Sequence, residues 1–363
     1  MERRSFLKAA TVGAAATTIA APALAQQAMP EIKWRMASSF PKSLDTIYGG
    51  GEFVAKRVAE LTDGKFQIRV FAGGEIVPGL QVLDAVQQGT VECGHSVAYY
   101  YVGKDPTFAF EAAMPFGLNA RQNHAWLYHG GGLALVREFY KDYNVINFPA
   151  GNSGTQMGGW FRKEIKSVQD LQGLKMRIAG IAGRVMAKLG VVPQQLAGGD
   201  IYPALEKGTI DAAEWVGPYD DEKLAFYKVA KNYYYPGFWE GGPTFSCYVN
   251  LDQWAKLPKL YQVAFETACT EATMDMQSKY DVQNITGLKK LVGAGTALRP
   301  FPKDVMIAAQ KAAFELYDEI AKENPKFAKI YGPWKAFRDD VQLWWKVAEF
   351  SFDQFVLTNP VKK

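Results

Sequence analysis

Arg177 and Glu214 are charged residues in apolar stretches of the sequence, an unusual neighbourhood for a guanidinium or a carboxylate without a partner. Arg177 stands between Met176 and Ile178, and Glu214 precedes Trp215. An arginine guanidinium can hold a ligand carboxylate through two parallel hydrogen bonds, a geometry that lysine cannot match. Glu214 would repel such an anion unless a cation lay between the two carboxylates. The alternative is an arginine that faces solvent or pairs internally with Glu214.

Other side chains that could do chemistry are few. The glycine-rich stretch GNSGTQMGGW (151–160) supplies an amide, Gln156, but it lacks the spacing of a nucleophile elbow. The chain contains neither a dinucleotide-binding nor a Walker A motif. His124 and His129 are five residues apart, so they do not share one helical face, and a core position is the favoured interpretation of His95. Catalytic zinc and a phosphate site are not favoured.

Aromatic residues form two clusters. Core packing explains most of them, but one or two tyrosines in each cluster could close a small pocket with an inward hydroxyl. Tyr100 is the candidate in the first cluster. The clustered residues are Tyr99, Tyr100, Tyr101, Tyr233, Tyr234, Tyr235, Phe238 and Trp239.

The elements that must position these residues follow from an internal repeat. Three pairs of segments match in the same order along the chain. They are IKWRMA (32–37) with LKMRIA (174–179), FAGGE (71–75) with LAGGD (196–200), and AVQQGTVE (85–92) with ALEKGTID (204–211). Each copy predicts strand, helix, strand, helix, strand, the half-unit of a doubly wound sheet.

The predicted elements have definite boundaries. In the first copy, strands are expected at 32–37 and 66–71, with helical periodicity from Ile47 to Leu61. In the second copy, strands are expected at 174–179, 191–196 and from 209 to about 215. Its second helix is predicted to have Asp200 as N-cap, Pro203 in the first turn and Gly208 at the end.

Ligands of open parallel sheets bind outside the carboxyl ends of the strands. Glu214 and Trp215 fall at that end of the third strand of the second copy, and Arg177 lies near the end of its first strand. His95 and Ser96 occupy the matching place in the first copy. The sequence therefore predicts a cleft between two α/β domains, with hinge crossings near residues 150 and 241.

The predicted domains are discontinuous. Domain I is expected at 26–151 plus about 242–290, and domain II at 152–241 plus about 291–334. Residues 251–292 predict a long helix interrupted near Pro258. A C-terminal helix over 335–363 carries apolar residues at helical spacing, and either packing across the domains or a dimer contact explains it. These residues are Phe337, Val341, Trp344, Ala348, Phe352 and Phe355.

Residues 1–25 resemble an export signal, with Arg3 and Arg4 before a small, apolar stretch and Ala23-Leu24-Ala25 as a cleavage site. Glu2 departs from the usual twin-arginine pattern, so the general secretion route stays open. Removing three positive charges and one negative charge changes the net charge from +4 to +2. The net charge is small, and lysine and arginine are spread along the chain rather than clustered. Both features disfavour a nucleic-acid partner.

Cysteine usage adds little. The three cysteines, Cys93, Cys247 and Cys269, have no metal-like spacing, and buried free thiols are the favoured interpretation.

Four motifs together resemble the solute-binding proteins of tripartite ATP-independent periplasmic (TRAP) transporters. They are GGDIYPALEKGTIDAAEWVGP, LQGLKMR, YYYVGKDPTFAF and GNSGTQMGGW. The chain is most similar to the branch that binds 2-oxo acids such as pyruvate. The resemblance implies a two-lobed periplasmic-binding-protein-like α/β fold that closes on a small monocarboxylate and delivers it to a sodium-driven membrane permease.

The resemblance also implies residue roles. Arg177 would hold the substrate carboxylate. A sodium or calcium ion would lie beside it, held by Gln156, Glu214 and the backbone oxygen of Trp215, with Tyr100 contributing from the first lobe. The long C-terminal helix would pair two subunits. This points to an exported binding protein rather than an enzyme; the alternatives are an exported enzyme acting on 2-oxo or 2-hydroxy acids and a ligand-binding sensory module.

Overall fold

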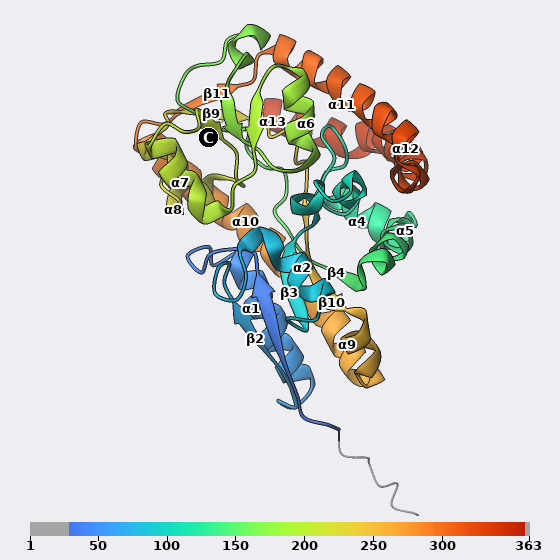
Figure 1. Cartoon of the computed structure of the whole chain (residues 1–363). Coiled ribbons are helices and arrows are strands. Elements are labelled where there is room, and N and C mark those ends of the chain that lie inside the picture. Colours follow the sequence, from blue (N-terminus) through green and yellow to red (C-terminus); the bar gives the residue numbers. More distant parts are fainter. Residues whose placement is uncertain (1–28, 360–363) are drawn as a thin grey trace, which may run out of the picture. The chain divides into compact units, whose positions relative to one another are not determined.

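The computed structural model describes residues 29–359 (Figure 1). The predicted export signal at 1–25 and the end of the predicted C-terminal helix lie outside these residues. From Glu31 onward the chain forms one compact unit that contains two β-sheets.

The first sheet has the strand order β2-β1-β3-β10-β4. Strands β1, β2 and β3 are parallel, whereas β10 runs antiparallel to both of its neighbours. The bounds are β1 Ile32–Ser38, β2 Phe66–Phe71, β3 Cys93–Val97, β4 Val145–Asn152 and β10 Thr244–Asn250.

The second sheet has the order β11-β9-β5-β8-β6-β7. Strands β6, β7 and β8 are parallel, and β5 is antiparallel to β8 and β9. The bounds are β5 Gly159–Phe161, β6 Lys175–Arg177, β7 Val192–Gln194, β8 Ala212–Ala213, β9 Asn232–Tyr235 and β11 Ala297–Pro300.

Helices connect the strands of both sheets. The α-helices are α1 Ile47–Leu61, α2 Val82–Gln87, α3 Ala109–Ala112, α4 Ala120–His129, α5 Gly132–Tyr140, α6 Gly180–Lys188, α7 Gly198–Glu206, α8 Pro218–Lys223, α9 Leu251–Lys256, α10 Lys259–Gly293, α11 Lys303–Glu323, α12 Pro325–Trp345 and α13 Ser351–Thr358. A π-helical segment, Lys346–Phe350, joins α12 to α13. The predicted long helix with a break at Pro258 is confirmed as α9 and α10.

The predicted repeat is confirmed by topology. The first copy runs β1-α1-β2-α2-β3 and the second β6-α6-β7-α7-β8. Their strands lie in the same spatial order, β2-β1-β3 and β7-β6-β8. Each sheet also contains antiparallel strands, because the chain returns to the first sheet through β10 and enters the second through β5. The fold is α/β, and both sheets are mixed rather than wholly parallel.

The helix prediction around Asp200 was wrong in detail. Helix α7 begins at Gly198 with Ala197 as N-cap, so Asp200 lies in the first turn and Pro203 falls inside the helix. The amide of Asp200 donates to the Ala197 carbonyl at 2.9 Å, which shows that the turn has already started. Gly208 has a φ of +71°, the left-handed conformation predicted at the helix end.

The predicted domain division remains a prediction, although the sheets separate along similar lines. Strands from residues 32–152 and 244–250 share the first sheet, and the remaining strands share the second. The chain crosses between the sheets after β4 and after β9, close to the predicted hinges, and a third time through α9 and α10, between β10 and β11. Helix α10 packs against α1 and β4 of the first part and against α8 of the second. Figure 1 shows α10 in orange beside both.

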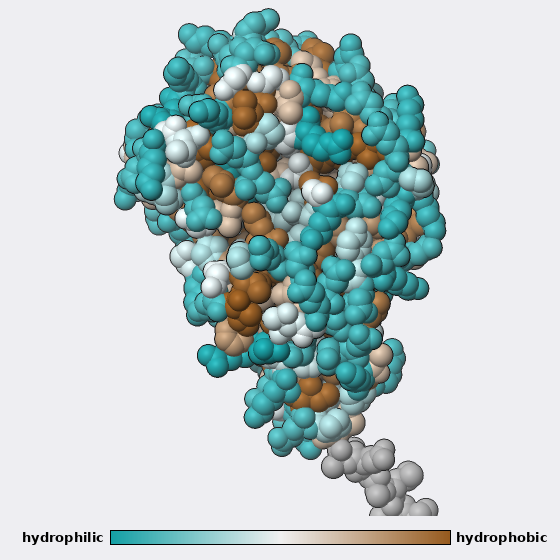
Figure 2. Space-filling model, in the orientation of Figure 1, coloured by the Kyte–Doolittle hydropathy of each residue, from teal (hydrophilic) through white to brown (hydrophobic). Residues whose placement is uncertain are grey.

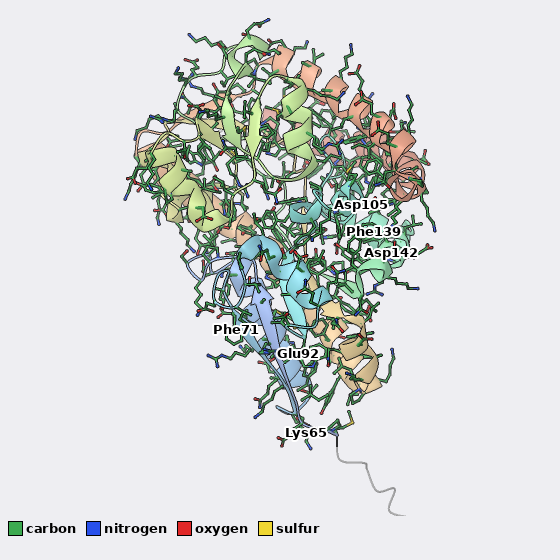
Figure 3. All side chains as sticks on the ribbon, in the orientation of Figure 1. Lys65, Phe71, Glu92, Asp105, Phe139 and Asp142 are labelled. Carbon is green, nitrogen blue, oxygen red and sulfur yellow. The ribbon has the colours of Figure 1, made fainter. Side chains whose placement is uncertain are left out.

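Polar contacts hold the first sheet in register. Glu92, which is labelled in Figure 3, lies before β3. It accepts from the backbone amide of Arg35 in β1 at 2.8 Å and forms an ion pair with the Arg35 guanidinium at 2.9 Å. Asp105 accepts from Thr107 at 2.9 Å and from Asn324 at 3.0 Å, so the segment after the first tyrosine cluster is tied to the end of α11. The backbone that follows β3 is thereby held by a local hydrogen bond from Thr107 and by a long-range one from Asn324.

Within residues 29–359, no helix is long and apolar enough to cross a membrane. On the face shown in Figure 2, hydrophobic residues form separate patches among hydrophilic ones. Cys93, Cys247 and Cys269 are buried free thiols, as predicted.

Candidate ligand-binding site

Arg177, at the end of β6, is only 1% exposed. Its Nε donates to the Leu196 carbonyl at 3.2 Å and its Nη1 to the Glu214 carbonyl at 3.0 Å. Nη1 also forms an ion pair with the Glu214 carboxylate. The guanidinium carbon lies 5.1 Å from the centre of the Trp215 ring. The solvent-facing alternative for Arg177 is therefore wrong, and the internal pair with Glu214 is present.

Glu214 reaches Arg177 because of strand register. Strands β6 and β8 are parallel, with Arg177 opposite Ala213, so both carboxyl ends meet at one edge. The Glu214 amide donates to the Arg177 carbonyl at 3.2 Å, and its carboxylate accepts from the Ala179 amide at 3.3 Å. Burial raises the pKa of Glu214, and the neighbouring positive charge of Arg177 opposes that shift.

Gln156 lies on the segment that crosses from the first sheet to the second. Its side-chain nitrogen donates to the Ser153 hydroxyl at 3.1 Å. Its backbone amide donates to the Glu240 carbonyl at 3.1 Å. The next residue, Met157, donates to the Val216 carbonyl at 3.0 Å. The crossing segment therefore runs beside the chain that carries Glu214 and Trp215.

Close backbone approach at this place requires glycine. Gly159 has a φ of +88°, and a β-carbon there would lie 2.5 Å from the Ala213 carbonyl oxygen. At Gly237, a β-carbon would lie 2.6 Å from the carbonyl oxygens of Gln156 and Met157. These glycines of the two crossing segments let the backbone pack directly against the site.

Each of the four residues predicted in the second lobe keeps one buried polar atom without a hydrogen-bond partner. Such atoms are costly when they are left unpaired. Two are acceptors, the side-chain oxygens Oε1 of Gln156 and Oε2 of Glu214, and two are donors, Nη2 of Arg177 and Nε1 of Trp215. Acceptor oxygens suit a hard cation and a guanidinium donor suits a carboxylate, so the residues present fit both groups.

Tyr100 borders the site from the first-sheet side. Its carbonyl accepts from the Gln195 side chain at 2.8 Å, so it contacts the end of β7. Burial raises the pKa of the Tyr100 hydroxyl, and the positive charge of Arg177 opposes that shift. Tyr100 is therefore close enough to Arg177 to feel its charge, and its role in ligand binding stays a prediction.

Sequence reasoning missed a second buried carboxyl, Glu240, on the segment that returns to the first sheet. It accepts from the Tyr99 hydroxyl at 3.1 Å. Burial, and then the negative charge of Glu214, raise its pKa well above the ordinary value, and Arg177 opposes this shift. The signal was an acidic residue directly after Phe238 and Trp239, the same juxtaposition of acid and aromatic that drew attention to Glu214.

The first-copy counterparts do not join the site. His95 is fully buried, lies edge-on to Phe40 at 5.5 Å and faces Gly50 and Gly51 of α1. Burial lowers its pKa to about 4, so it is neutral at neutral pH. Ser96 accepts from the Ser39 and Tyr101 hydroxyls. The buried position of His95 agrees with the core interpretation, although neither ring nitrogen has a hydrogen-bond partner.

A groove of about 500 Å³ opens next to the site. The two Ala-Gly-Gly-acid turns of the repeat face each other across it, with Gly73 and Gly74 on one side and Gly198 and Gly199 on the other. Leu196, whose carbonyl binds Arg177, also lines the groove. The groove therefore reaches Leu196, which contacts the guanidinium, but the five predicted site residues do not line it.

No cluster of three or more histidine, cysteine, aspartate or glutamate side chains in the described part of the chain is arranged to hold a metal ion. A cation at the candidate site would instead be held by one carboxylate, one amide oxygen and a backbone oxygen. Such oxygen ligands suit sodium or calcium rather than zinc.

A mixed α/β fold with two repeat-related sheets, joined beside a buried guanidinium and carboxyl groups, defines a two-lobed solute-binding protein. The chain belongs to the bacterial extracellular solute-binding proteins of family 7 (DctP), whose family model matches residues 37–324.

Individual relatives extend this result. A monocarboxylate 2-oxoacid-binding periplasmic protein from a Nostoc species is 54% identical over 364 residues, covering 99% of this chain and all of the relative. A TRAP transporter solute-binding protein from Bordetella bronchiseptica is 54% identical, with a TM-score of 0.90 over 91% of this chain and 98% of its own. It is described as a mixed-occupancy dimer with co-purified calcium and picolinate bound.

A third relative, from Pseudoalteromonas atlantica, is 39% identical, with a TM-score of 0.86 over 89% of this chain and 99% of its own. That TRAP periplasmic solute-binding protein contains bound sodium and pyruvate. The predicted family and the two-lobed fold are confirmed.

Proposed function

We propose that this protein is the periplasmic solute-binding component of a TRAP transporter and that it captures a small monocarboxylate, a 2-oxo acid such as pyruvate, together with a cation. The loaded protein delivers the acid to a sodium-driven membrane permease. The observation that carries the proposal is the set of unpartnered buried atoms around one ion pair: Arg177 Nη2, Glu214 Oε2 and Gln156 Oε1.

Each group has a distinct role in this proposal. Arg177 donates from Nη2 to the ligand carboxylate. Glu214 Oε2, Gln156 Oε1 and the backbone oxygen of Trp215 hold the cation, which offsets the repulsion between Glu214 and the ligand. The same cation can bind the 2-oxo oxygen, so carboxylate and keto group are recognised together. Tyr100 closes the site from the first-sheet side.

The relatives support this ligand class. The Nostoc protein is described as binding monocarboxylate 2-oxo acids, and the Pseudoalteromonas protein holds pyruvate with sodium. A protein from Colwellia psychrerythraea, 38% identical, holds pyruvate with calcium. Sodium and calcium are both compatible with the oxygen donors present here.

The size of the ligand sets what the site must do. A ligand of about six heavy atoms at a ceiling of about 1.5 kcal/mol per atom reaches about 9 kcal/mol, which permits micromolar binding. A charge-assisted hydrogen bond contributes only about 1.5–3 kcal/mol of this. Enclosure of the ligand by both lobes is therefore needed.

The C-terminal helices suggest the assembly. Phe337 and Val341 of α12 pack against the core. Farther along, large apolar side chains are 48–78% exposed, and we propose that they pair two subunits. They are Leu343, Trp344, Val347, Phe350, Phe352, Phe355, Val356 and Leu357.

The test is a tryptophan-fluorescence titration of protein that has been unfolded, stripped with chelator and refolded. Pyruvate, 2-oxobutyrate, lactate and succinate are each added with sodium, calcium or neither. We expect saturable binding of a monocarboxylate that weakens without the cation. Two results would contradict the proposed function: binding of succinate but of none of the monocarboxylates, or monocarboxylate binding with the same affinity whether or not a cation is present.

A further inference from the structure

Asp45 lies in the connection between β1 and α1, and it contacts a helix that follows β8 of the second sheet. Its neighbours Leu44 and Thr46 are 0% and 2% exposed, whereas the Asp45 side chain is 50% exposed. Buried residues on both sides hold the backbone in place, so the carboxylate is presented from a fixed position.

Three donors converge on Asp45. The Tyr219 hydroxyl of α8 donates to Oδ2 at 3.1 Å, and Lys223 of the same helix forms an ion pair with Oδ1. Lys279 of α10 donates to the Asp45 carbonyl at 2.8 Å and lies 3.1 Å from Oδ2. The Lys223 ammonium also lies 3.8 Å from the centre of the Tyr219 ring. The two lysines hold the pKa of Asp45 at about 2 despite partial burial, so the carboxylate is charged at neutral pH.

Helix α8 is tied at the same time to the chain that forms the ligand site. Asp221 of α8 accepts from the Val216 amide at 3.3 Å, directly after Glu214 and Trp215. It also accepts from Trp160 at 2.9 Å and from Tyr233 at 2.7 Å, on strands β5 and β9. Movement of α8 therefore moves the backbone beside the ligand site.

Helix α8 also packs closely on α10. The Tyr280 hydroxyl donates to Asp220 at 2.6 Å, and the Tyr219 amide donates to Asn284 at 3.0 Å. A β-carbon on Gly287 would lie 2.7 Å from Pro218. The first half of α10 is anchored elsewhere, where Glu271 forms an ion pair with Arg57 of α1. Helix α10 thus spans both parts of the chain, and Asp45 lies where α8, α10 and the β1–α1 connection meet.

We propose that Asp45 is a positioning residue for ligand retention: its bonds to Tyr219 and Lys223 of α8, supported by Lys279 of α10, form a closure contact that holds α8 against the first-sheet part while the ligand is enclosed. The inference rests on the proposed function, because enclosure matters only if the buried site binds a ligand. No covalent segment links Asp45 directly to α8, so the contact can break when the lobes separate.

The closure contact predicts a specific kinetic signature. Partly exposed ion pairs contribute modestly and are screened by salt. Asp45→Asn should therefore raise the dissociation rate of pyruvate about 3- to 10-fold and leave the association rate nearly unchanged. The dependence of the dissociation rate on ionic strength should decrease. Asp45→Glu keeps the charge and should recover part of the wild-type rate.

The experiment is stopped-flow tryptophan fluorescence on the full mature chain with pyruvate and calcium, at low and high ionic strength. Glu266→Gln is the matched control, because Glu266 pairs with Arg137 at 3.1 Å, away from α8. Lys223→Gln is the second variant, and it should add little to Asp45→Asn in the double variant. It also replaces Asp45→Asn if that variant does not fold.

The outcomes separate the two proposals. Wild-type protein that binds none of the monocarboxylates contradicts the proposed function. Normal binding by wild-type protein, combined with unchanged dissociation rates in Asp45→Asn and Lys223→Gln, overturns the closure contact alone. A lowered melting temperature with unchanged dissociation would show that Asp45 is only structural, and this too would overturn the inference.

Discussion

At the scale of single residues, the central feature is the Arg177 guanidinium, which forms an ion pair but keeps one nitrogen without a hydrogen-bond partner. Arg177 binds two carbonyl groups and one carboxylate and keeps Nη2 without a partner. A buried ion pair is weak evidence for stability by itself, because desolvation offsets much of the attraction. Its value here lies in orientation: Glu214 and the carbonyls fix the guanidinium plane before a ligand arrives.

Replacing Arg177 by lysine tests this role. Lysine keeps the charge opposite Glu214 but cannot present the planar fork, so Arg177→Lys should weaken pyruvate binding by about 10- to 150-fold, the equivalent of about 1.5–3 kcal/mol. Isothermal titration calorimetry measures the affinity, and thermal unfolding reports whether the fold is intact. Arg184→Lys, at an exposed position of α6, is the matched control. If Arg177→Lys folds and keeps wild-type affinity, Arg177 does not bind the ligand carboxylate.

At the scale of elements, α8 supports the site through two buried carboxyl groups. Burial raises the pKa of Asp221 to about 7 and that of Asp220 to about 6. Between about pH 4 and 7 the folded state holds protons that the unfolded state has released, so the free energy of unfolding falls as pH rises through this range. Well above the folded-state pKa of Asp221, both carboxyl groups are ionised in the folded and unfolded states, and the contribution levels off.

Asp221→Asn should remove the larger part of this pH dependence. The slope of the unfolding free energy between pH 5 and 7 should become less negative by up to about 1.4 kcal/mol per pH unit. Urea denaturation at several pH values measures it. Asp275→Asn, at an exposed position of α10, is the control and should keep the wild-type slope. The same slope in Asp221→Asn as in wild-type protein would show that Asp221 is not protonated in the folded state.

At the scale of the whole molecule, the exposed apolar residues of α12, the π-helical segment and α13 predict a dimer. Phe352 and Phe355 are 66% and 69% exposed. A double substitution, Phe352→Glu with Phe355→Glu, should convert a dimer to a monomer in size-exclusion chromatography with light scattering. Met274→Glu, at a 72% exposed position of α10, should leave the dimer unchanged. A wild-type monomer across the micromolar range would contradict the prediction.

Much of the fold was predictable from local patterns. The repeat fixes two half-units with the same strand order, and Ile47 to Leu61 is a helix at both predicted ends. Predictions failed where tertiary contacts decide at which residue a strand or helix begins and ends. Strand β8 is only Ala212–Ala213, and α7 starts before Asp200. The segment of β10 was assigned to the predicted first domain, but neither the strand nor its antiparallel direction was predicted, because no periodicity in the first copy indicates them.

The site was predictable only in part. Arg177, Glu214 and Trp215 come from one repeat, so parallel pairing of β6 with β8 implies their proximity. Glu240 and Tyr99 are 141 residues apart, and their contact depends on how the crossing segments meet. Nothing in the sequence around Asp45 distinguishes it from other aspartates. Only the fold shows that it contacts Tyr219, Lys223 and Lys279.

The most direct measurement is a crystal structure of the protein with pyruvate and calcium, using anomalous scattering to locate the ion. Calcium should lie within about 2.3–2.6 Å of Gln156 Oε1, Glu214 Oε2 and the Trp215 carbonyl oxygen. The pyruvate carboxylate should accept from Arg177 Nη2, and its keto oxygen should bind the ion. An ion bound elsewhere, or a carboxylate held by residues other than Arg177, would show that Arg177, Gln156 and Glu214 do not form the ligand site.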